Sequence, residues 1–476
     1  MENPIGKEEL LTQLGKYGQQ HVVQFWDRLD DRQRRNLTEQ LLDIDWDSFD
    51  GWVRDYVLNQ QSAGLPPDLK PAPYFPLAPR NAAEATLFDG ARRRGTTLLK
   101  EGRVSAFTVA GGQGTRLNYE GPKGTFPISP IRRKTLFQLF AETIVRAQEK
   151  YGKIIPWYVM TSPVNDAVTR EFFQANDGFG LRPRDVMFFM QGTLPAIGLD
   201  GKLLLAAPDS LALSPNGHGG CLLALRQSGA LADMLRRKVE HISYWQIDNP
   251  LVQMFDPLFI GLHDLTASEM SSRALLKTGP FEKLGNYALH AGKLTIIEYS
   301  DMPEALAQAK EPDGRLRFRI GSPAIHLLAR EFVERLTEKG RLQLPLHRAV
   351  KKVATIDANG EPAKIHHPNA VKLEMFIFDA LPLARRPLIL EAEREEQFGP
   401  VKNPTGVDSV ETSQRLQQER AARWLEAAGV PVPRHADGTV NCRLELSPRR
   451  FLEREDVLAA GPQLTPPPAG GEAYYE

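Results

Sequence analysis

The feature that most constrains the fold of this chain is an apolar segment that runs directly into a glycine cluster. It reads Thr108-Val-Ala-Gly-Gly-Gln-Gly-Thr-Arg-Leu117 and is followed by Pro122-Lys123-Gly124. Glycines at the end of a strand let the backbone approach a ligand and point N–H groups at phosphate oxygens. Arg116 and Lys123 add positive charge that could neutralise a triphosphate. The pattern predicts phosphate binding at the carboxyl end of a strand.

Two better-known phosphate motifs do not fit this segment. The dinucleotide fingerprint needs a third glycine where Leu117 stands, and the P-loop needs Ser or Thr after the lysine, where Gly124 follows Lys123. A nicotinamide-dependent dehydrogenase also needs an acidic residue at the end of a second strand, but residues 127–143 begin with turn and basic residues. A plain glycine-rich turn with nearby surface cations is the structural alternative.

Apolar β-rich runs alternate with amphipathic stretches after this loop, which predicts βαβ units and a mostly parallel sheet in an α/β, Rossmann-like fold. The strands are expected at 105–110, 157–161, 186–190, 242–247, 294–299 and 388–390, and the helices at 136–149, 167–175 and 414–428.

The remaining segments define three expected regions. Residues 1–84 form a helical N-terminal region, in which residues 7–60 are helical and a proline-rich connector covers 62–80. Residues 85–395 form the catalytic domain. Residues 396–476 form a small α+β region, whose last dozen residues, rich in proline and glycine, are expected to be disordered.

Charge and composition restrict the partners. The chain has 59 basic and 59 acidic side chains, so there is no excess charge to hold nucleic acid or an anionic membrane. No basic leader precedes an apolar core at the N-terminus, and the two cysteines cannot form a disulfide framework. These features predict a cytoplasmic protein.

Beyond the glycine loop, the chain resembles the UDP-sugar pyrophosphorylases over about residues 20–410, and within them the UDP-N-acetylglucosamine pyrophosphorylase branch. The resembling segments are Arg133–Gln138, Met160–Ser162, Phe189–Ala196, Gly217–Gly220, Asp248–Asn249 with Asp256–Pro257, Glu298–Ser300, Pro368–Asn369, Glu374–Asp379 and Val401–Asn403. The resemblance implies a central nucleotidyltransferase domain between a helical N-terminal region and a C-terminal region.

The same resemblance assigns site residues. It implies nucleotide contacts from Ala110, Gly111, Gly112, Gly114, Thr115, Gln191, Gly217 and His218, and sugar contacts from Gly285, Glu298 and Tyr299. It also implies that Lys402 contacts a phosphate group from the C-terminal side. The structural alternatives are a loop amide for Gln191 and a solvated side chain for Lys402.

Asp248 follows an apolar strand, and a carboxylate in that place suits Mg²⁺, which prefers hard oxygen ligands. A helix cap is its alternative role, and Asp379 is a weaker candidate for a second ligand. Asp256, which precedes Pro257, is expected to start a turn. No zinc site is indicated.

The hypothesis is a UTP-dependent transfer in which a sugar 1-phosphate oxygen attacks the α-phosphorus and expels pyrophosphate. Arg116 and Lys123 would screen the β- and γ-phosphates, Mg²⁺ on Asp248 would hold the α-phosphate, and Lys402 would bring in the sugar phosphate. Catalysis would then consist mainly of positioning and charge neutralisation.

Two positions depart from the N-acetylglucosamine branch. His218 stands where that branch has asparagine and the glucose branch has histidine, and Ile325 replaces an asparagine that contacts the sugar. N-acetylglucosamine 1-phosphate is the expected substrate, and glucose 1-phosphate is the alternative. A nucleotide-sugar binding protein without turnover is a further alternative, although it would be free to lose Arg116, Lys123, Asp248 and Lys402. The sequence does not predict the oligomeric state.

Overall fold

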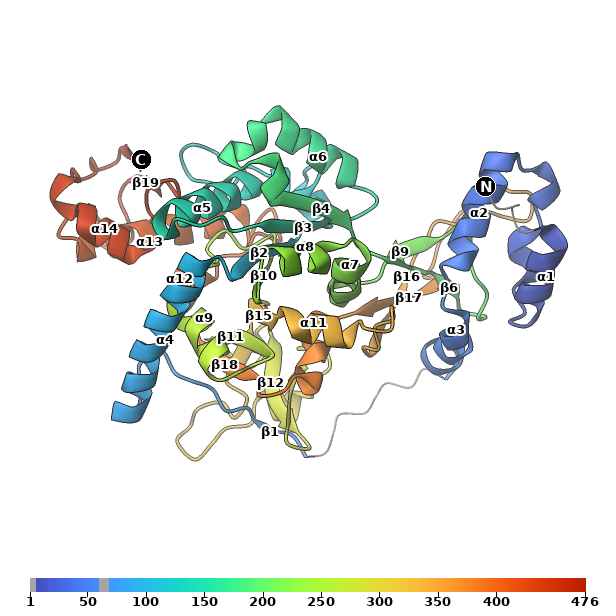
Figure 1. The fold of residues 1–476 in the computed structure, drawn as a ribbon, viewed down its shortest axis with the longest axis horizontal. Coiled ribbons are helices and arrows are strands. Elements are labelled where there is room, and N and C mark those ends of the chain that lie inside the picture. The colour runs from blue at the N-terminus through green and yellow to red at the C-terminus, as the bar shows by residue number, and fades with distance from the viewer. Residues whose placement is uncertain (1–5, 60–67) are drawn as a thin grey trace. The chain divides into compact units, whose positions relative to one another are not determined.

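The structure is a computed structural model that describes residues 6–59 and 68–476, and the chain divides into two compact units (Figure 1). Unit 1 contains residues 1–66, 192–221 and 343–379, and unit 2 contains residues 67–191, 222–342 and 380–476. The units interleave along the sequence and do not follow the three consecutive regions predicted above. Residues 62–67 of the expected connector lie outside the described residues.

Unit 2 is built on an eleven-stranded sheet. Its strands are β1 (Lys70–Pro71), β2 (Val104–Val109), β3 (Trp157–Thr161), β4 (Val186–Met190), β10 (His241–Gln246), β11 (Met270–Leu276), β12 (Gly285–His290), β13 (Lys293–Ile297), β14 (Ile320–Ser322), β15 (His326–Ala329) and β18 (Leu388–Glu391). The main path through the sheet is β1-β12-β14-β11-β15-β10-β2-β3-β4, with β13 on β12 and β18 on β11.

The prediction of an α/β fold is confirmed, but the prediction of a mostly parallel sheet is wrong because the sheet is mixed. Strands β10, β2, β3 and β4 are parallel neighbours, as is the pair β11 and β18. The other pairs in the sheet are antiparallel. Only two residues, Ala291 and Gly292, separate β12 from β13, and so short a link permits a hairpin but no parallel crossover.

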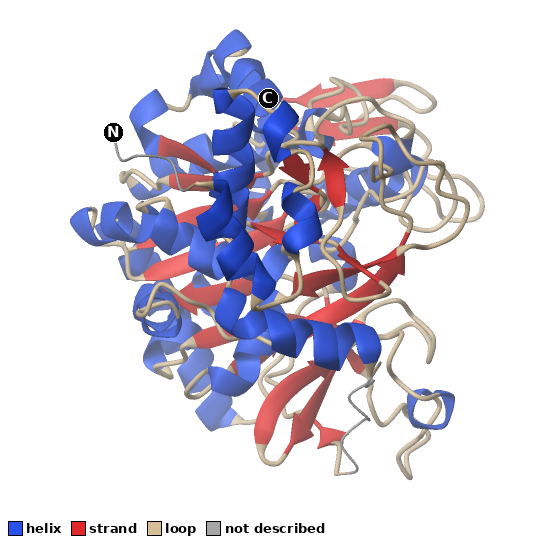
Figure 2. Cartoon of the chain, turned by 90° about the vertical axis from the view of Figure 1, so that its right-hand side faces the viewer, coloured by secondary structure: helices blue, strands red, loops and turns tan. Residues whose placement is uncertain are grey.

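Helices lie against the strands in Figure 2. The helices of unit 2 before residue 400 are α4 (Ala82–Glu101), α5 (Leu136–Tyr151), α6 (Asp166–Ala175), α8 (Ala230–Arg236), α9 (Pro257–Leu265), α10 (Glu304–Ala307), α11 (Arg330–Leu336) and α12 (Arg394–Gln397), while α7 (Cys221–Gln227) starts at the end of a unit 1 segment. Trp157, Trp245, Phe137 and Phe140 are buried in the core between helices and sheet. The proline-rich segment contributes β1, so it is not entirely without regular structure.

Unit 1 carries the helices α1 (Lys7–Gly15), α2 (Asp31–Leu42) and α3 (Trp46–Trp52), which confirm the predicted helical N-terminal region. Their apolar residues, among them Leu10, Leu14, Leu37 and Leu41, form one core with strand residues of the same unit. Those strands are β5 (Thr193–Pro195), β6 (Ile197–Gly198), β7 (Leu205–Ala207), β8 (Ser210–Leu211), β9 (Leu213–Pro215), β16 (Leu346–Lys351) and β17 (Ala370–Met375).

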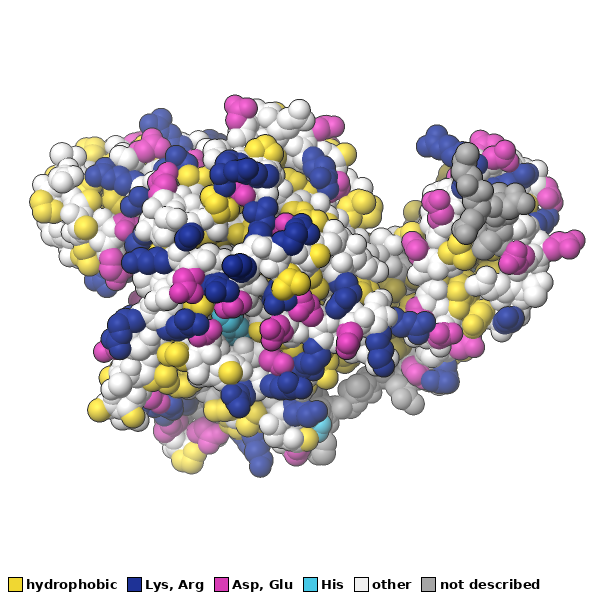
Figure 3. All heavy atoms as spheres, viewed as in Figure 1, with side chains coloured by type: hydrophobic (Ala, Val, Ile, Leu, Met, Phe, Trp, Pro, Cys, Tyr) yellow, Lys and Arg dark blue, Asp and Glu magenta, His cyan; other side chains and the backbone are white. Residues whose placement is uncertain are grey.

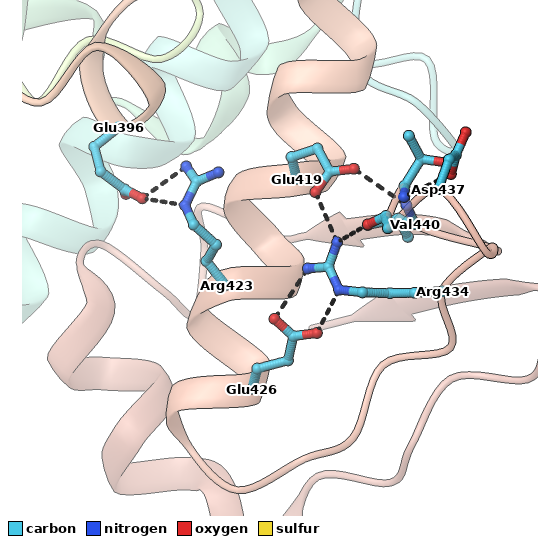
Figure 4. A network of polar contacts seen from close by, with 9 residues as sticks. Glu396, Glu419, Arg423, Glu426, Arg434, Asp437 and Val440 are labelled. Atoms are coloured by element: carbon cyan, nitrogen blue, oxygen red, sulfur yellow. Dashed lines mark hydrogen bonds and ion pairs between the residues drawn. The ribbon is translucent and has the colours of Figure 1, made fainter.

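The C-terminal part of unit 2 consists of α13 (Val410–Ala427), β19 (Arg443–Leu446), α14 (Arg454–Ala460) and β20 (Glu472–Tyr475). Arg434 bonds to Glu419 and Glu426 of α13, and Arg423 bonds to Glu396 of α12 (Figure 4). The expected disorder at the end of the chain is wrong, because β20 pairs in parallel with β19 and its residue Tyr475 is buried.

Positive and negative side chains are interspersed over the face seen in Figure 3, as expected for a chain of zero net charge. Within residues 6–59 and 68–476, no helix has both the length and the apolar character needed to cross a bilayer. Both thiols are free; Cys221 is buried and Cys442 is half-buried.

Helices α4 and α9, which are neighbours in Figure 1, approach each other closely at Gly95 and Gly261. A Cβ on Gly95 would lie 1.9 Å from the carbonyl oxygen of Pro257, and one on Gly261 would lie 1.8 Å from that of Ala91. Because both contacts are with backbone atoms, the movement of a side chain cannot relieve either of them. Glycine is therefore required for this close packing of the two helices.

We expect Gly95→Ala to lower the free energy of unfolding by about 1–3 kcal/mol, the usual cost of overpacking. Gly90 offers a matched control in the same helix, because a Cβ there meets only Leu265 at 4.0 Å. Gly90→Ala should stabilise the helix by about 0.5–1 kcal/mol. Urea unfolding followed by tryptophan fluorescence measures both; equal effects of the two variants would contradict the packing.

Candidate functional site

The glycine loop begins where β2 ends, and the backbone of β3 and the side chain of Asn165, directly before α6, hold it. Ala110 is fully buried, and its N–H donates to the carbonyl of Met160 at 2.7 Å. The buried amide of Asn165 donates to the carbonyl of Ala110 at 3.0 Å and accepts from the N–H of Ser162 at 2.8 Å. Asn165 was not predicted as a site residue, since a lone asparagine before a helix resembles any loop residue.

Gln191 lies over the first glycine of the loop. A Cβ on Gly111 would come within 2.6 Å of Gln191 Oε1, so only glycine leaves room for this amide. Gln191 follows β4, is 8% exposed, and donates its N–H to the carbonyl of Thr161 at 2.9 Å. Two neighbouring parallel strands, β3 and β4, therefore place an amide side chain beside the glycine loop.

The rest of the loop folds back on itself through backbone hydrogen bonds. Lys123 N–H donates to the carbonyl of Gly112 at 3.0 Å, and Gly114 N–H donates to that of Gly121 at 2.9 Å. Gly112, Thr115 and Arg116 are exposed on this loop. In the part of the chain that the structure describes, no ion-pair partner is recorded for Arg116. Its guanidinium is thus available to an anionic ligand.

Lys123 and Asp248 meet at the carboxyl ends of two adjacent parallel strands. Strand β10 pairs with β2 in parallel register, with Gln246 opposite Val109. Lys123 Nζ lies 3.9 Å from Asp248 Oδ2, and both side chains are 14% exposed. This distance is longer than a direct hydrogen bond, so the carboxylate keeps capacity for another ligand.

A segment near residue 400 is fixed against Asp248. Val401 N–H donates to the carbonyl of Asp248 at 2.8 Å. The buried amide of Asn249 donates to the carbonyl of Gln397 at 2.7 Å and accepts from the N–H of Gly399 at 3.0 Å. These bonds place the Lys402 backbone directly after a residue bonded to Asp248, while Lys402 Nζ lies 3.6 Å from Asp408 Oδ2.

The expected sugar residues gather at one end of the β12–β13 hairpin. A Cβ on Gly285 would lie 2.6 Å from Ile296 and 3.4 Å from Glu298 Oε1. Tyr299 follows Glu298 and is 45% exposed. Ile325, which replaces the asparagine discussed above, is 3% exposed and packs in the main core.

Asp256 serves a structural role. Its side chain accepts from the N–H of Leu258 at 2.8 Å, which caps α9, and it forms an ion pair with the buried Arg273. Asp256, which was expected to start a turn, therefore caps the N-terminus of helix α9.

Gly217 and His218 belong to unit 1. Gly217 has φ +83°, and a Cβ there would lie 2.4 Å from the carbonyl oxygen of Met375. Burial and the nearby His347 lower the pKa of His218 to about 4, so its ring is neutral at pH 7. Asp379, the weaker metal candidate, bonds to His347 Nε2 at 2.8 Å.

Comparison with known proteins identifies the family. The family model described as UTP–glucose-1-phosphate uridylyltransferase matches residues 81–418. This chain belongs to the UDP-sugar pyrophosphorylase family. Its members are nucleotidyltransferases of nucleotide-sugar synthesis, and the chain is accordingly a uridylyltransferase.

Relatives within this family match most of the chain. UDP-N-acetylglucosamine diphosphorylase 2 of Arabidopsis thaliana is 32% identical over 475 residues, covering 95% of this chain and 91% of the relative. UDP-N-acetylglucosamine pyrophosphorylase of Saccharomyces cerevisiae is 37% identical over 350 residues, covering 71% and 73%. The structure of the corresponding Trypanosoma brucei enzyme, in complex with an inhibitor, covers 100% of this chain and 99% of its own, with TM-score 0.82 and 23% identity. The similarity to the Trypanosoma brucei structure shows that the two chains share a fold.

Gly124 gives a test of how tightly the loop is held. A Cβ there would lie 2.1 Å from the ring of Phe137, which is fully buried in the pyrophosphorylase core. We expect Gly124→Ala to lower the melting temperature by several degrees and to weaken the stabilisation by UTP, because Lys123 would shift with the loop. Differential scanning fluorimetry measures both.

Gly112→Ala is the matched comparison for stability without ligand, since a Cβ at Gly112 meets nothing within 4 Å. Its melting temperature should equal that of the parent protein. A Gly124→Ala variant as stable as Gly112→Ala would contradict the tight contact with Phe137.

Proposed function

We propose that this enzyme forms UDP-N-acetylglucosamine and pyrophosphate from UTP and N-acetylglucosamine 1-phosphate. The similarity to the Arabidopsis and yeast enzymes of that name, over most of each chain, supports this substrate. The main structural observation in support of the proposal is the proximity of Lys123 and Asp248 beside the glycine loop. An oxygen of the sugar phosphate forms a bond to the α-phosphorus, and the bond from that phosphorus to the bridging oxygen of pyrophosphate breaks.

Both reactants are anionic, so the barrier includes electrostatic repulsion. Lys123 and the exposed Arg116 screen the β- and γ-phosphates, and the loop N–H groups bind phosphate oxygens. Lys402 guides the sugar phosphate toward the α-phosphorus, and its ammonium lies 3.6 Å from Asp408 Oδ2, which is longer than a direct hydrogen bond. These groups act by positioning and by charge neutralisation, with no protein nucleophile.

Asp248 fits a divalent cation. Its carboxylate ends a buried strand and is partly accessible, and the one ion pair recorded for it in the described residues is the long one with Lys123. Mg²⁺ prefers such oxygen ligands, and when bound it would supply positive charge to phosphate oxygens. Asp248 is the residue that would hold it.

The remaining contacts follow the expected assignment. Ala110, Gly111, Gly112, Gly114 and Thr115 surround the phosphates, and the amide of Gln191 can both donate to and accept from uracil. Gly217 and His218 contact the nucleotide. Gly285, Glu298 and Tyr299 contact the sugar. A cytoplasmic location stays a prediction.

Glucose 1-phosphate is a second candidate substrate. His218 matches the glucose branch at its position, and Ile325 is a buried apolar residue that cannot hydrogen-bond a sugar. Pyrophosphate release from UTP and Mg²⁺ with glucose, galactose, N-acetylglucosamine and N-acetylgalactosamine 1-phosphates separates the candidates. We expect the highest kcat/KM with N-acetylglucosamine 1-phosphate; highest activity with glucose 1-phosphate would favour the second candidate.

Lys123→Ala should lower kcat by about 10²–10³-fold, which is the usual loss when a group that stabilises transition-state charge is removed. The melting temperature should change little, since Lys123 forms only a long ion pair. Steady-state pyrophosphate release and thermal melting are the measurements.

Lys100→Ala is the matched control, because Lys100 is an exposed lysine on α4 outside the site. It should turn over at the parent rate. Near-parent turnover by a well-folded Lys123→Ala protein would exclude this role for Lys123.

A further inference from the structure

Two imidazole rings stack on one phenylalanine in unit 1. The ring of His218 lies 5.1 Å from that of Phe376 with an interplanar angle of 10°, and the ring of His347 lies 4.1 Å from it with an angle of 24°. We call His218, Phe376 and His347 the imidazole stack. All three residues belong to the same compact unit, so their contacts are internal to it.

The backbone fixes which nitrogen of His218 carries the proton. The N–H of Ile377 donates to His218 Nδ1 at 3.2 Å, so Nδ1 must be the acceptor. A neutral imidazole has one acceptor nitrogen and one N–H donor, which places the proton on Nε2. Low basicity keeps the ring neutral, as described above. His218 is half-buried, and in the described residues Nε2 has no recorded hydrogen-bond partner.

A carboxylate anchors the second imidazole of the stack, that of His347. His347 Nε2 lies 2.8 Å from Asp379 Oδ2, and the Asp379 side chain is 14% exposed. This bond restrains rotation of the His347 ring, and the ring in turn supports Phe376. An outer hydrogen bond of this kind is a general way to orient a functional histidine or its support.

The two backbone segments that carry the stack cannot move apart easily. Met375 N–H donates to the carbonyl of Asn216 at 2.8 Å. A Cβ on Gly219 would lie 2.7 Å from backbone atoms of Met375 and Phe376, so the segments are already in contact. Because the backbone is held in place, the His218 ring can move only by turning about its own side-chain bonds. Its position therefore depends on the side chains that support the ring.

We propose that His347 and Asp379 are positioning residues that, through Phe376, hold His218 as a fixed Nε2–H donor for the bound substrate. This inference rests on the proposed function, in which His218 contacts the nucleotide sugar. A donor of fixed direction requires an acceptor in the ligand, namely a phosphate, carbonyl or hydroxyl oxygen. Asparagine in the same place would offer both a donor and an acceptor, so the two residues select ligand atoms differently.

Three variants separate stacking from anchoring. His347→Ala removes the ring, His347→Phe keeps a ring but loses the bond to Asp379, and Asp379→Asn keeps an acceptor for His347. We expect His347→Ala to raise KM for UTP or for the sugar phosphate by about tenfold, with a smaller change in kcat, at the lower end of losses for outer-shell partners. His347→Phe should show a smaller increase in KM, and Asp379→Asn, which keeps an acceptor oxygen for His347, should show the smallest increase of the three.

His290→Ala is the matched control. It removes an exposed histidine that also bonds to an aspartate, Asp68, but lies on β12 outside the stack. Its kinetic constants should equal those of the parent. Thermal melting of all variants checks folding, and His347→Phe preserves the test if His347→Ala is unstable.

Nitrogen-15 NMR of histidine-labelled, ligand-free protein gives a readout independent of activity. His218→Asn identifies the His218 signals by their loss. The parent should show an unprotonated Nδ1 and a protonated Nε2. In His347→Ala the unsupported His218 ring can turn away from the N–H of Ile377, so both signals should shift toward the average of the two tautomers. A proton on Nδ1 in the parent, or unchanged signals and KM in His347→Ala, would overturn the inference.

Absence of pyrophosphate release by the parent with every sugar phosphate would instead overturn the proposed function, while the NMR result would still decide the role of the stack.

Discussion

The site depends on the parallel pairing of β2 with β10. Because both strands end at the same edge of the sheet, the loop after β2 and the residue after β10 meet there, and Lys123 comes within 3.9 Å of Asp248. Strands β3 and β4 continue the parallel order and deliver Asn165 and Gln191 to the same edge. Ligands of open α/β sheets bind at the carboxyl ends of the strands, and here four consecutive strands supply the groups of the proposed site.

Two buried asparagine amides turn this arrangement into a fixed site. Asn165 joins the glycine loop to the end of β3, and Asn249 joins the end of β10 to residues 397–399. A buried amide without partners would be costly, so each of these side chains stabilises only the backbone arrangement that satisfies it. Charged groups can then act on a substrate without large rearrangement of the protein, which is the basis of electrostatic catalysis.

The sequence predicted the parallel half of the sheet well, because its strands are continuous apolar runs that alternate with amphipathic helices. The predicted strands at 157–161 and 186–190 coincide with β3 and β4. Strand β11 escaped prediction because Ser271, Ser272 and Arg273 are polar and yet buried. Their polar groups contact His263, His326 and Asp256, respectively, which lie outside the strand, so the strand itself shows no apolar pattern.

The same limit applied to the site. The glycines, Lys123 and Asp248 carry local signals, and Lys402 was assigned through the family resemblance. Asn165 and the imidazole stack depend on long-range contacts such as that of His218 with residues 376–377. The interleaved units and strand β20 also arise from pairings between distant segments, so periodicity within one window could not reveal them. Structural features that follow from a local sequence pattern were predictable, whereas features that depend on the packing of distant segments were not.

We propose that a uridylyl group passes from UTP to a sugar phosphate at the edge where β2 and β10 end. UTP that carries ³²P at either the α- or the γ-position, incubated with Mg²⁺ and N-acetylglucosamine 1-phosphate, tests this transfer. The α-label should appear in the nucleotide sugar and the γ-label in pyrophosphate. Label from the γ-position on the sugar, or no transfer of α-label to any sugar phosphate, would contradict it.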